Sequence, residues 1–269
     1  MSLDRSKVNE SAAIHSTRRI VNYPKLSVQL YTVREAMQDD LSGSLARIAE
    51  IGYTQVEPYN FPNVDGLGEA LAAAGLTAPT GHAHYLGEDE AELNRVFASA
   101  KALGIDLAID PHVATERWQS EEDVREIAEQ LNAAAVVAAN YGVTVGYHNH
   151  GHELASHFGD QTALEFFAGL LDPQVRLEVD TYWVVVGGED PVALLGRLGA
   201  QVAAIHVKDG AGTTEVKDQT AVGAGSLPIR AIIEAAPNAL RVVELDDSHT
   251  DRFQAVAESF AWLVKENLA

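Results

Sequence analysis

Cysteine is absent from the 269 residues of this sequence. A chain without thiols has no disulfide framework, no thiolate-bound zinc, no iron–sulfur cluster and no cysteine nucleophile. Any metal site in this chain must therefore be built from oxygen atoms and imidazole rings. Histidine supplies those rings in number, since it occurs ten times.

Basic residues are scarce, because 19 Lys and Arg stand against 39 Asp and Glu and give a formal net charge of −20. Binding to a phosphate backbone needs a basic surface, so this balance argues against a nucleic-acid partner. Long apolar runs are also missing: no stretch approaches the roughly 18 apolar residues of a membrane span, and none of signal-peptide length follows the first basic residues. We expect a cytoplasmic protein that binds neither nucleic acid nor membrane.

From residue 26 onward the sequence alternates two patterns, and its 46% apolar content is enough for a large core. Short runs of apolar and β-branched residues predict eight strands, at 26–31, 54–58, 78–84, 106–110, 143–148, 175–180, 202–207 and 240–245. Segments with helical spacing of apolar residues lie between them, at 41–51, 65–75, 89–104, 120–141, 160–171, 190–199, 227–236 and 250–266.

Strands that alternate with helices imply right-handed parallel crossovers, and eight such units close naturally into a (β/α)₈ barrel. The alternative is an open doubly wound sheet, which usually has a glycine-rich phosphate loop after its first strand. Here that strand leads into Thr32-Val33-Arg34-Glu35 instead. We predict an α/β fold, a single-domain TIM barrel over residues 26–269, preceded by an N-terminal extension over residues 1–25.

Polar side chains gather at the predicted carboxyl ends of the strands, where the active site of such a barrel lies. These positions hold Gln29, Glu57, His82, His84, Asp110, His112, His148, His150, Asp180, His206, Lys208, Glu244 and Asp246. Only His15 and His157 lie well away from the strand ends, and His249 follows the eighth strand by a few residues.

Asp180, His206 and Glu244 form the sharpest subset, because they end three successive strands and should converge on one side of the barrel mouth. Two carboxylates and one imidazole suit a divalent cation such as Mn²⁺, Mg²⁺, Co²⁺ or Zn²⁺. Each residue alone is more simply explained as a buried polar group with hydrogen-bond partners. Together at matching depth they favour a metal site, since unpaired buried charge is costly.

The motifs around these residues resemble the strand-end motifs of the xylose isomerase-like TIM barrel superfamily. That group includes sugar phosphate isomerases and epimerases and the second family of abasic-site endonucleases. The similarity covers about residues 26–265 and is carried by these segments: Val179-Asp180-Thr181-Tyr182-Trp183, Ile205-His206-Val207-Lys208-Asp209, Val242-Val243-Glu244-Leu245-Asp246, residues 27–32, residues 52–57 and residues 147–153.

The resemblance implies a divalent metal held by Glu, Asp, His and Glu from strands five to eight. Asp180, His206 and Glu244 match the last three ligands, but His148 stands where the family's epimerases have the first Glu. His148 could bind the same metals, or Glu153 could reach the metal from the following loop. The replacement also removes one of two facing glutamates that exchange protons in those epimerases, and a histidine here resembles the inosose dehydratase branch.

The remaining polar residues suggest roles in catalysis and substrate binding. Glu244 and His148 are the candidate acid–base groups, and Lys208 would neutralise a developing oxyanion or form a salt bridge with Asp209 or Glu178. The residues predicted to bind substrate are Glu57, His82, His84, His150 and Trp183. Because Arg34 and Lys208 are the few basic residues near the mouth, an unphosphorylated substrate fits better than a sugar phosphate.

The sequence thus predicts an enzyme, a divalent-metal isomerase or epimerase of a sugar, keto-sugar or inositol-type polyol. The reaction would abstract an α-proton and pass through a metal-stabilised enediolate. One alternative is an inosose dehydratase-like lyase that eliminates water from a keto-inositol or keto-sugar. Another is a barrel that binds sugar without turning it over. A homodimer is the default expectation for such barrels.

Overall fold

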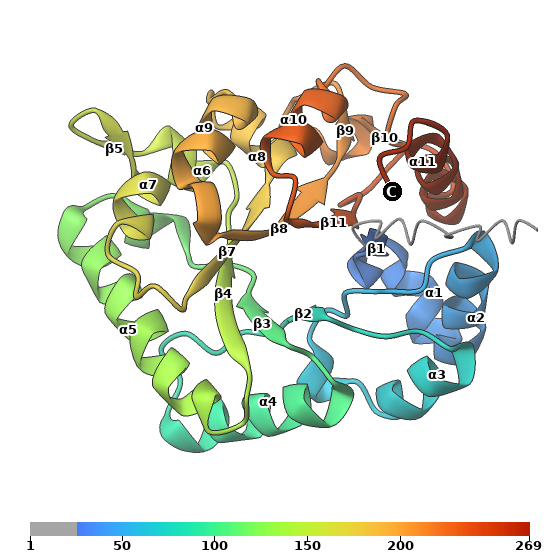
Figure 1. Cartoon of the computed structure of the whole chain (residues 1–269), viewed down its shortest axis with the longest axis horizontal. Coiled ribbons are helices and arrows are strands. Elements are labelled where there is room, and N and C mark those ends of the chain that lie inside the picture. Colours follow the sequence, from blue (N-terminus) through green and yellow to red (C-terminus); the bar gives the residue numbers. More distant parts are fainter. Residues whose placement is uncertain (1–25) are drawn as a thin grey trace, which may run out of the picture.

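The computed structural model describes residues 26–269, so the predicted extension over residues 1–25 lies outside the described residues. Within the described range, seven parallel strands form one curled sheet (Figure 1). Their order across the sheet is β1 (Leu26–Val28), β11 (Leu240–Val243), β8 (Val202–Val207), β7 (Arg176–Asp180), β4 (Thr144–His148), β3 (Leu107–Asp110) and β2 (Thr80–His82). This order follows the chain around a ring, and the predicted TIM-barrel architecture is confirmed.

The segment over residues 54–58 differs from its prediction, because it forms isolated bridges rather than a continuous strand. Glu57 bridges Gln29 and Gln55 bridges Thr77, both in parallel. The Glu57 amide donates to the Val28 carbonyl at 2.8 Å, and the Pro58 carbonyl accepts from the His82 amide at 2.8 Å. Pro58 has no N–H to extend the ladder, yet these bonds still join the β1 and β2 edges of the sheet.

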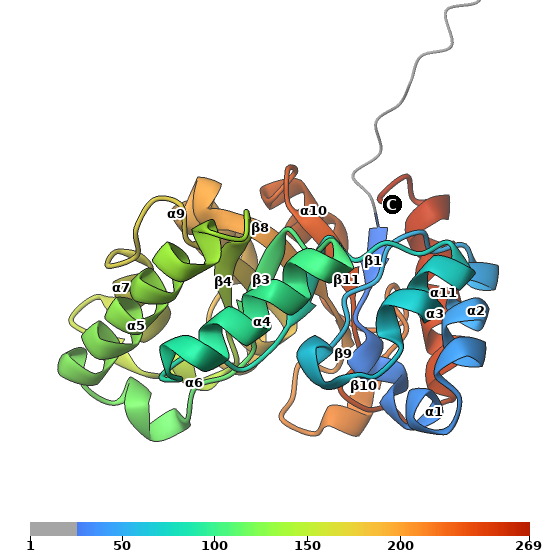
Figure 2. The same ribbon diagram turned by 90° about the horizontal axis from the view of Figure 1, so that it is seen from below.

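Helices cover the outside of the ring, close to where helical spacing predicted them (Figures 1 and 2). They are α2 (Leu41–Ile51), α3 (Leu67–Ala74), α4 (Glu90–Leu103), α5 (Glu121–Ala139), α7 (Ala163–Ala168), α9 (Pro191–Leu198), α10 (Ile229–Ala235) and α11 (Arg252–Lys265). Local signals explain their ends. The Ser120 side chain accepts from the Asp123 amide at the start of α5, and Gly75 and Gly104 end α3 and α4 with positive φ.

Shorter elements that the spacing did not predict lie in the loops after the strands. They are α1 (Arg34–Asp39), α6 (His152–Ala155), α8 (Thr181–Val186) and the two-residue pairings of β5 (His157–Phe158) with β6 (Gln161–Thr162) and of β9 (Asp209–Gly210) with β10 (Gln219–Thr220). Figure 2 shows α1, α6, β9 and β10 at the same end of the barrel. That end is the mouth, because the strands reach it with their carboxyl termini.

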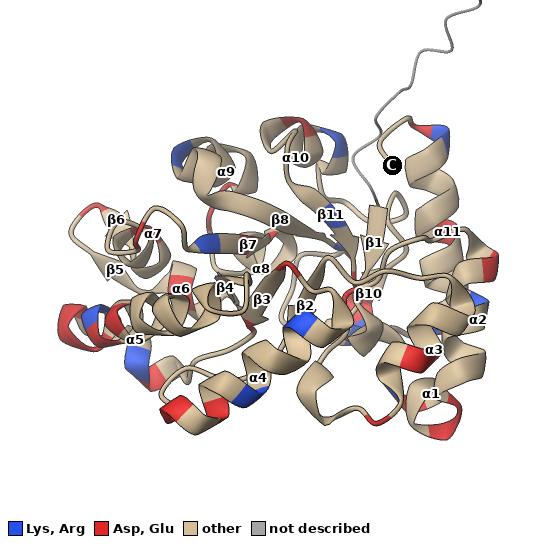
Figure 3. Cartoon of the chain, turned by 60° about the horizontal axis from the view of Figure 1, so that its bottom comes forward, with Lys and Arg blue, Asp and Glu red and all other residues tan. Residues whose placement is uncertain are grey.

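The main core fills the space between the strands and the outer helices. The side of α5 that faces the sheet buries residues spaced three and four apart, namely Val124, Ile127, Ala128, Leu131, Ala134, Ala135 and Ala138. Asp and Glu residues instead lie along the solvent side of outer helices such as α4 and α5 (Figure 3). None of the helices formed by residues 26–269 has the length and apolar character that a membrane crossing needs.

Candidate active site

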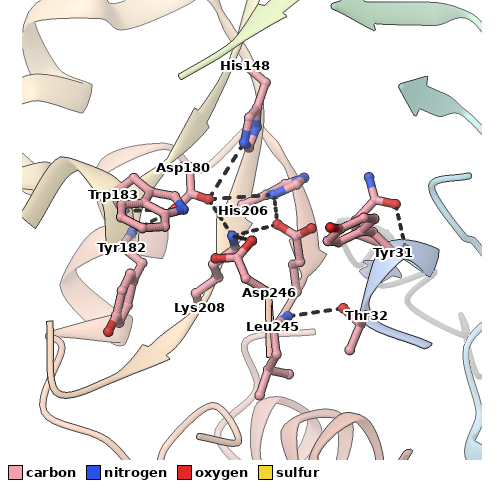
Figure 4. Close-up of polar contacts among 12 residues, drawn as sticks. Tyr31, Thr32, His148, Asp180, Tyr182, Trp183, His206, Lys208, Leu245 and Asp246 are labelled. Atoms are coloured by element: carbon pink, nitrogen blue, oxygen red, sulfur yellow. Dashed lines mark hydrogen bonds and ion pairs between the residues drawn. The ribbon is translucent and has the colours of Figure 1, made fainter. Parts of the chain in front are cut away.

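The structure brings Asp180, His206 and Glu244 together at the mouth of the barrel, and Figure 4 shows Asp180 beside His206. Asp180 at the end of β7 lies opposite His206 on β8 in the sheet register. Glu244 directly follows β11, and its Oε2 lies 2.6 Å from His206 Nδ1. One ligand atom from each of the three residues lies within 4.8 Å of the others, and all three residues are buried.

Asp180 is held in place by the helix that follows it. Its Oδ1 accepts hydrogen bonds from the amides of Tyr182 and Trp183, each at 3.0 Å, and so caps the start of α8. Its Oδ2 is buried and forms an ion pair with Lys208 Nζ at 2.8 Å. Burial raises the pKa of Asp180 to about 6, although the nearby charges of Lys208 and His206 oppose that shift.

His148, at the end of β4, adds an imidazole to this group. Its Nε2 lies 3.7 Å from Asp180 Oδ2. The site therefore offers two carboxylates and two imidazoles, a donor set that suits Zn²⁺, Co²⁺ or Mn²⁺. This donor set fits a divalent ion held by Asp180, His206, Glu244 and His148.

Glu153, the other predicted candidate for this position, points elsewhere. Its Oε1 accepts from the Tyr147 hydroxyl at 2.7 Å, and its Oε2 accepts from the His150 amide at 2.8 Å. Burial raises the pKa of Glu153 to about 7. Both oxygens are thus engaged in holding the loop that carries His150.

Lys208 lies among the same carboxylates rather than at the protein surface. Its Nζ is 2.8 Å from Asp180 Oδ2, 2.7 Å from Glu244 Oε2 and 2.9 Å from Asp246 Oδ1. Burial disfavours the charged amine, but the three carboxylates outweigh it and hold the pKa of Lys208 well above its usual value. The predicted salt bridge with Asp209 or Glu178 is not the one formed, because Lys208 pairs with Asp180, Glu244 and Asp246.

A second layer of charged side chains lies directly beneath this group, inside the barrel. Glu178 is two residues before Asp180 on β7 and shares its face of the strand. Its Oε2 lies 2.6 Å from His82 Nε2, 3.0 Å from His206 Nε2 and 3.1 Å from His148 Nδ1. Glu178 was not among the site residues predicted from the sequence. An acidic residue two positions before Asp180, with an apolar residue on either side of it in the strand, could have indicated it.

Glu57 completes this lower layer, so its placement differs from the predicted role in binding substrate. Its side chain is fully buried, and its Oε1 lies 2.8 Å from His206 Nε2 and 3.2 Å from His82 Nε2. Gln29 donates to the same oxygen at 2.8 Å. Glu57 therefore contacts histidines beneath the mouth and not the open pocket.

The histidines of the two layers differ in charge. Burial works against protonation of His82, yet the carboxylates of Glu57 and Glu178 raise its pKa to about 10. Burial and the neighbouring His206 lower the pKa of His148 well below its usual value. At neutral pH, His82 is therefore a cation between two carboxylates, whereas His148 is a neutral ring with one free lone pair.

An open pocket of about 520 Å³ lies above these layers. Its lining includes five of the predicted residues besides Glu244, namely His82, His84, His148, His150 and Trp183. His84 follows the end of β2, and its side chain is 70% exposed. His150 Nδ1 and Trp183 Nε1 are buried without hydrogen-bond partners among the described residues, so both can bond to a ligand.

The pocket is poor in positive charge. Arg34 is the fixed cation among its described lining residues, which also include Glu244, Asp246 and Asp247. The Arg34 guanidinium donates to the carbonyls of Tyr31 and Asp246, each at 2.9 Å, and packs 4.1 Å from the ring of Tyr31. Tyr31 and Tyr59 meet edge to face, 5.4 Å apart. This surface suits the apolar face and hydroxyls of a sugar better than a phosphate.

Solved structures with the same architecture confirm the fold. A sugar phosphate isomerase/epimerase from Parabacteroides distasonis ATCC 8503 superimposes with a TM-score of 0.75 at 22% identity, over 95% of this chain and 98% of that one. The IOLI protein with a bound zinc atom gives 0.69 at 17% identity, over 90% and 97%. The 3-keto-D-glucoside 4-epimerase YcjR from E. coli gives 0.67 at 17% identity, over 90% and 99%.

Comparison with known protein families agrees with the motifs and with the fold. A search of curated proteins finds no match. Residues 45–266, most of the chain, match the family described as xylose isomerase-like TIM barrel. With its barrel, its motifs at the strand ends and this match, the chain belongs to the xylose isomerase-like TIM barrel family.

Proposed function

We propose that this protein is a divalent-metal-dependent isomerase or epimerase of an unphosphorylated sugar, keto-sugar or inositol-type polyol. The observation that carries the proposal is the convergence of Asp180, His206 and Glu244, with His148 Nε2 3.7 Å from Asp180, next to a pocket that Glu244 and His148 line. The names of the structural relatives, which include a sugar phosphate isomerase/epimerase and a protein with bound zinc, support this class of reaction.

A divalent ion at these four residues would polarise a substrate carbonyl and stabilise the enediolate that forms when the neighbouring carbon loses a proton. The protein's own groups must move that proton. The Lys208 and His206 charges outweigh the effect of burial and hold the pKa of Glu244 below its usual range, so Glu244 is a carboxylate able to accept it. Lys208, 2.7 Å from Glu244, would add positive charge near the developing oxyanion.

Once Glu244 has taken the proton, it can return it to the neighbouring carbon on the same face, which completes an isomerisation with one group. An epimerisation needs a donor on the opposite face, and His150, which lines the pocket, would first have to take up a proton against the effect of burial, which lowers its pKa to about 3. A carboxylate facing imidazoles replaces the paired glutamates that the resemblance implies for the family's epimerases. The buried N–H of Trp183 and the rings of Tyr31 and Tyr59 would orient the substrate.

Metal analysis tests this proposal directly. Protein purified without chelator should carry a divalent ion, and activity lost after chelation should return with Mn²⁺, Mg²⁺, Co²⁺ or Zn²⁺. Asp180→Asn should abolish both binding and activity. Asp190→Asn is the matched control, because Asp190 caps α9 through Oδ1 just as Asp180 caps α8. Protein that neither binds nor responds to any of these ions would overturn the proposal.

The replacement of the expected glutamate by His148 favours a second candidate, a lyase that dehydrates a keto-inositol or keto-sugar. Proton NMR in deuterated water distinguishes the two reactions on a panel of keto-sugars and inososes. An isomerase keeps the substrate composition and incorporates deuterium next to the carbonyl. A lyase forms an enone or dione that absorbs in the ultraviolet, whereas binding without turnover would identify a sugar-binding barrel.

A further inference from the structure

His148 and His206 each join the two layers of the barrel mouth. The upper nitrogen of His206, Nδ1, faces Glu244 at 2.6 Å, while its lower nitrogen, Nε2, faces Glu57 at 2.8 Å and Glu178 at 3.0 Å. The upper nitrogen of His148, Nε2, faces Asp180 at 3.7 Å, and its lower nitrogen, Nδ1, faces Glu178 at 3.1 Å. Glu178 is thus shared by the lower nitrogens of both rings.

A carboxylate beneath a ring nitrogen determines where the ring's lone pair lies. Neutral imidazole has one N–H and one lone pair. A carboxylate that accepts the N–H holds that proton on its own side and leaves the lone pair on the opposite nitrogen. With a divalent ion in place of the upper proton of His206, Glu178 and Glu57 would keep the N–H of each ring on its lower nitrogen and leave the lone pairs to the ion, beside Asp180 and Glu244.

The same lower layer also has the composition of a metal site, because atoms of His82, His148, Glu178 and His206 lie within 4.8 Å of one another. Two observations argue against that use. His82 lies 2.6 Å from Glu178 and 3.2 Å from Glu57, so its positive charge already neutralises part of theirs. In addition, a ring that gives its lower lone pair to a metal has none left for the upper site.

We propose that Glu178, braced by His82 and assisted by Glu57, is a positioning residue that orients His148 and His206 for an ion bound in the upper layer. This inference rests on the proposed metal-dependent function. Carboxylates that hold metal-ligating imidazoles in this way typically change metal affinity by about 10–100-fold when removed. Glu178 acts through the two rings and does not itself touch the ion or the substrate.

Glu178→Gln tests the inference through metal affinity, measured by competition with a chromophoric chelator. The variant keeps the side-chain shape but has one oxygen instead of two, and we expect Co²⁺ or Zn²⁺ to bind about 10–100-fold more weakly. Glu153→Gln is the matched control, since it also changes a buried glutamate near the mouth but leaves the lower layer intact; its metal affinity should stay within about twofold. Equal metal affinity of Glu178→Gln and wild type would overturn this inference but would leave the proposed metal-dependent function standing.

Wild-type protein loaded with Co²⁺ gives a second test that does not depend on the folding of any variant. Proton NMR of such a protein shows shifted, exchangeable N–H signals from each imidazole bound to cobalt. The upper site predicts two such signals, from His148 and His206. Three signals, with a visible spectrum that changes in His82→Gln, would place the ion in the lower layer and overturn the inference. Wild type without any bound ion would overturn the proposed function as well.

Discussion

Lys208 shows at the scale of one residue how the site balances its charge. Its ammonium group lies within 2.9 Å of three carboxylates, two of which are proposed metal ligands. An ammonium and a divalent ion therefore share Asp180 and Glu244 and repel each other. In the proposed mechanism, the lysine would lower metal affinity while it supplies positive charge for the reaction.

Replacement of Lys208 by methionine should separate these two effects. We expect Lys208→Met to bind Mn²⁺ or Co²⁺ at least tenfold more tightly, about 1.4 kcal/mol, because the competing charge is gone. Its kcat should fall by about 100-fold, since the oxyanion loses its partner. Chelator competition and steady-state kinetics measure the two changes. Lys217→Met replaces an exposed lysine and should alter neither metal affinity nor kcat. Weaker metal binding by Lys208→Met would contradict the proposed competition between the ammonium group and the ion.

Glu153 gives a prediction about pH. Burial raises its pKa to about 7 in the folded protein, whereas the unfolded value is near 4.5, so the folded state binds an extra proton between these values. Wild type should therefore lose stability relative to Glu153→Gln as the pH rises from 5 to 8, by about 2–3 kcal/mol in total. Urea unfolding at several pH values measures the difference.

The matched control for this pH effect is Glu165→Gln. Glu165 is bonded to Arg197 and to its own helix start, and these contacts outweigh burial and lower its pKa. Its stabilising contribution is present above about pH 4.5 and is lost only in more acidic solution, so its stability difference from wild type should stay flat above pH 5. If the stability difference between wild type and Glu153→Gln did not change from pH 5 to 8, the predicted rise in the pKa of Glu153 would be contradicted.

At the scale of elements, short helices build the rim of the pocket. The loop before α6 carries His150, and α8 begins after Asp180 and carries Trp183. The two helices approach closely at Gly187, just after α8. A methyl group there would lie 2.5 Å from Leu154 Cβ and 2.7 Å from the Gly151 carbonyl oxygen. The position of Trp183 and His150 thus depends on this contact.

Gly187→Ala should consequently destabilise the protein by about 1–3 kcal/mol through overpacking and raise the KM for substrate. Gly196→Ala is the matched control, because Gly196 lies within α9 with nothing near the added methyl group. Alanine there favours the helix by roughly 0.5–1 kcal/mol, so the control should be slightly more stable. Chemical denaturation and substrate titration measure both outcomes, and equal behaviour of the two variants would refute close packing at Gly187.

The sequence predicted the long elements better than the rim. Strands and outer helices have apolar spacing that repeats over several residues, so their positions follow from the pattern. Helices of four to six residues, such as α6 and α8, are too short to show a period and depend on packing against neighbours. The prediction of Asp180, His206 and Glu244 needed only strand ends, whereas Glu178 lies one layer deeper, where a charge is unexpected without its three histidine partners.

At the scale of the whole molecule, the negative charge and the buried site have different consequences. Asp and Glu residues on outer helices (Figure 3) contribute to a net charge of −20, which attracts cations of any kind only weakly and in a salt-dependent way. The proposed metal site, a buried set of oxygen and imidazole ligands, would bind an ion only in the folded state. Metal binding should therefore stabilise the whole barrel, since Asp180, His206 and Glu244 come from three different strands.

Thermal unfolding measures this coupling. An ion at about 100 times its Kd adds about 2.7 kcal/mol to the free energy of unfolding, which corresponds to a rise in Tm of about 5–10 °C for a domain of this size. The rise should persist in 0.3 M salt, because the ligands are buried and poorly screened. Asp180→Asn should lose it, while Asp190→Asn should keep it. A rise that disappears in salt, or that survives in Asp180→Asn, would instead locate the bound cations on the acidic surface.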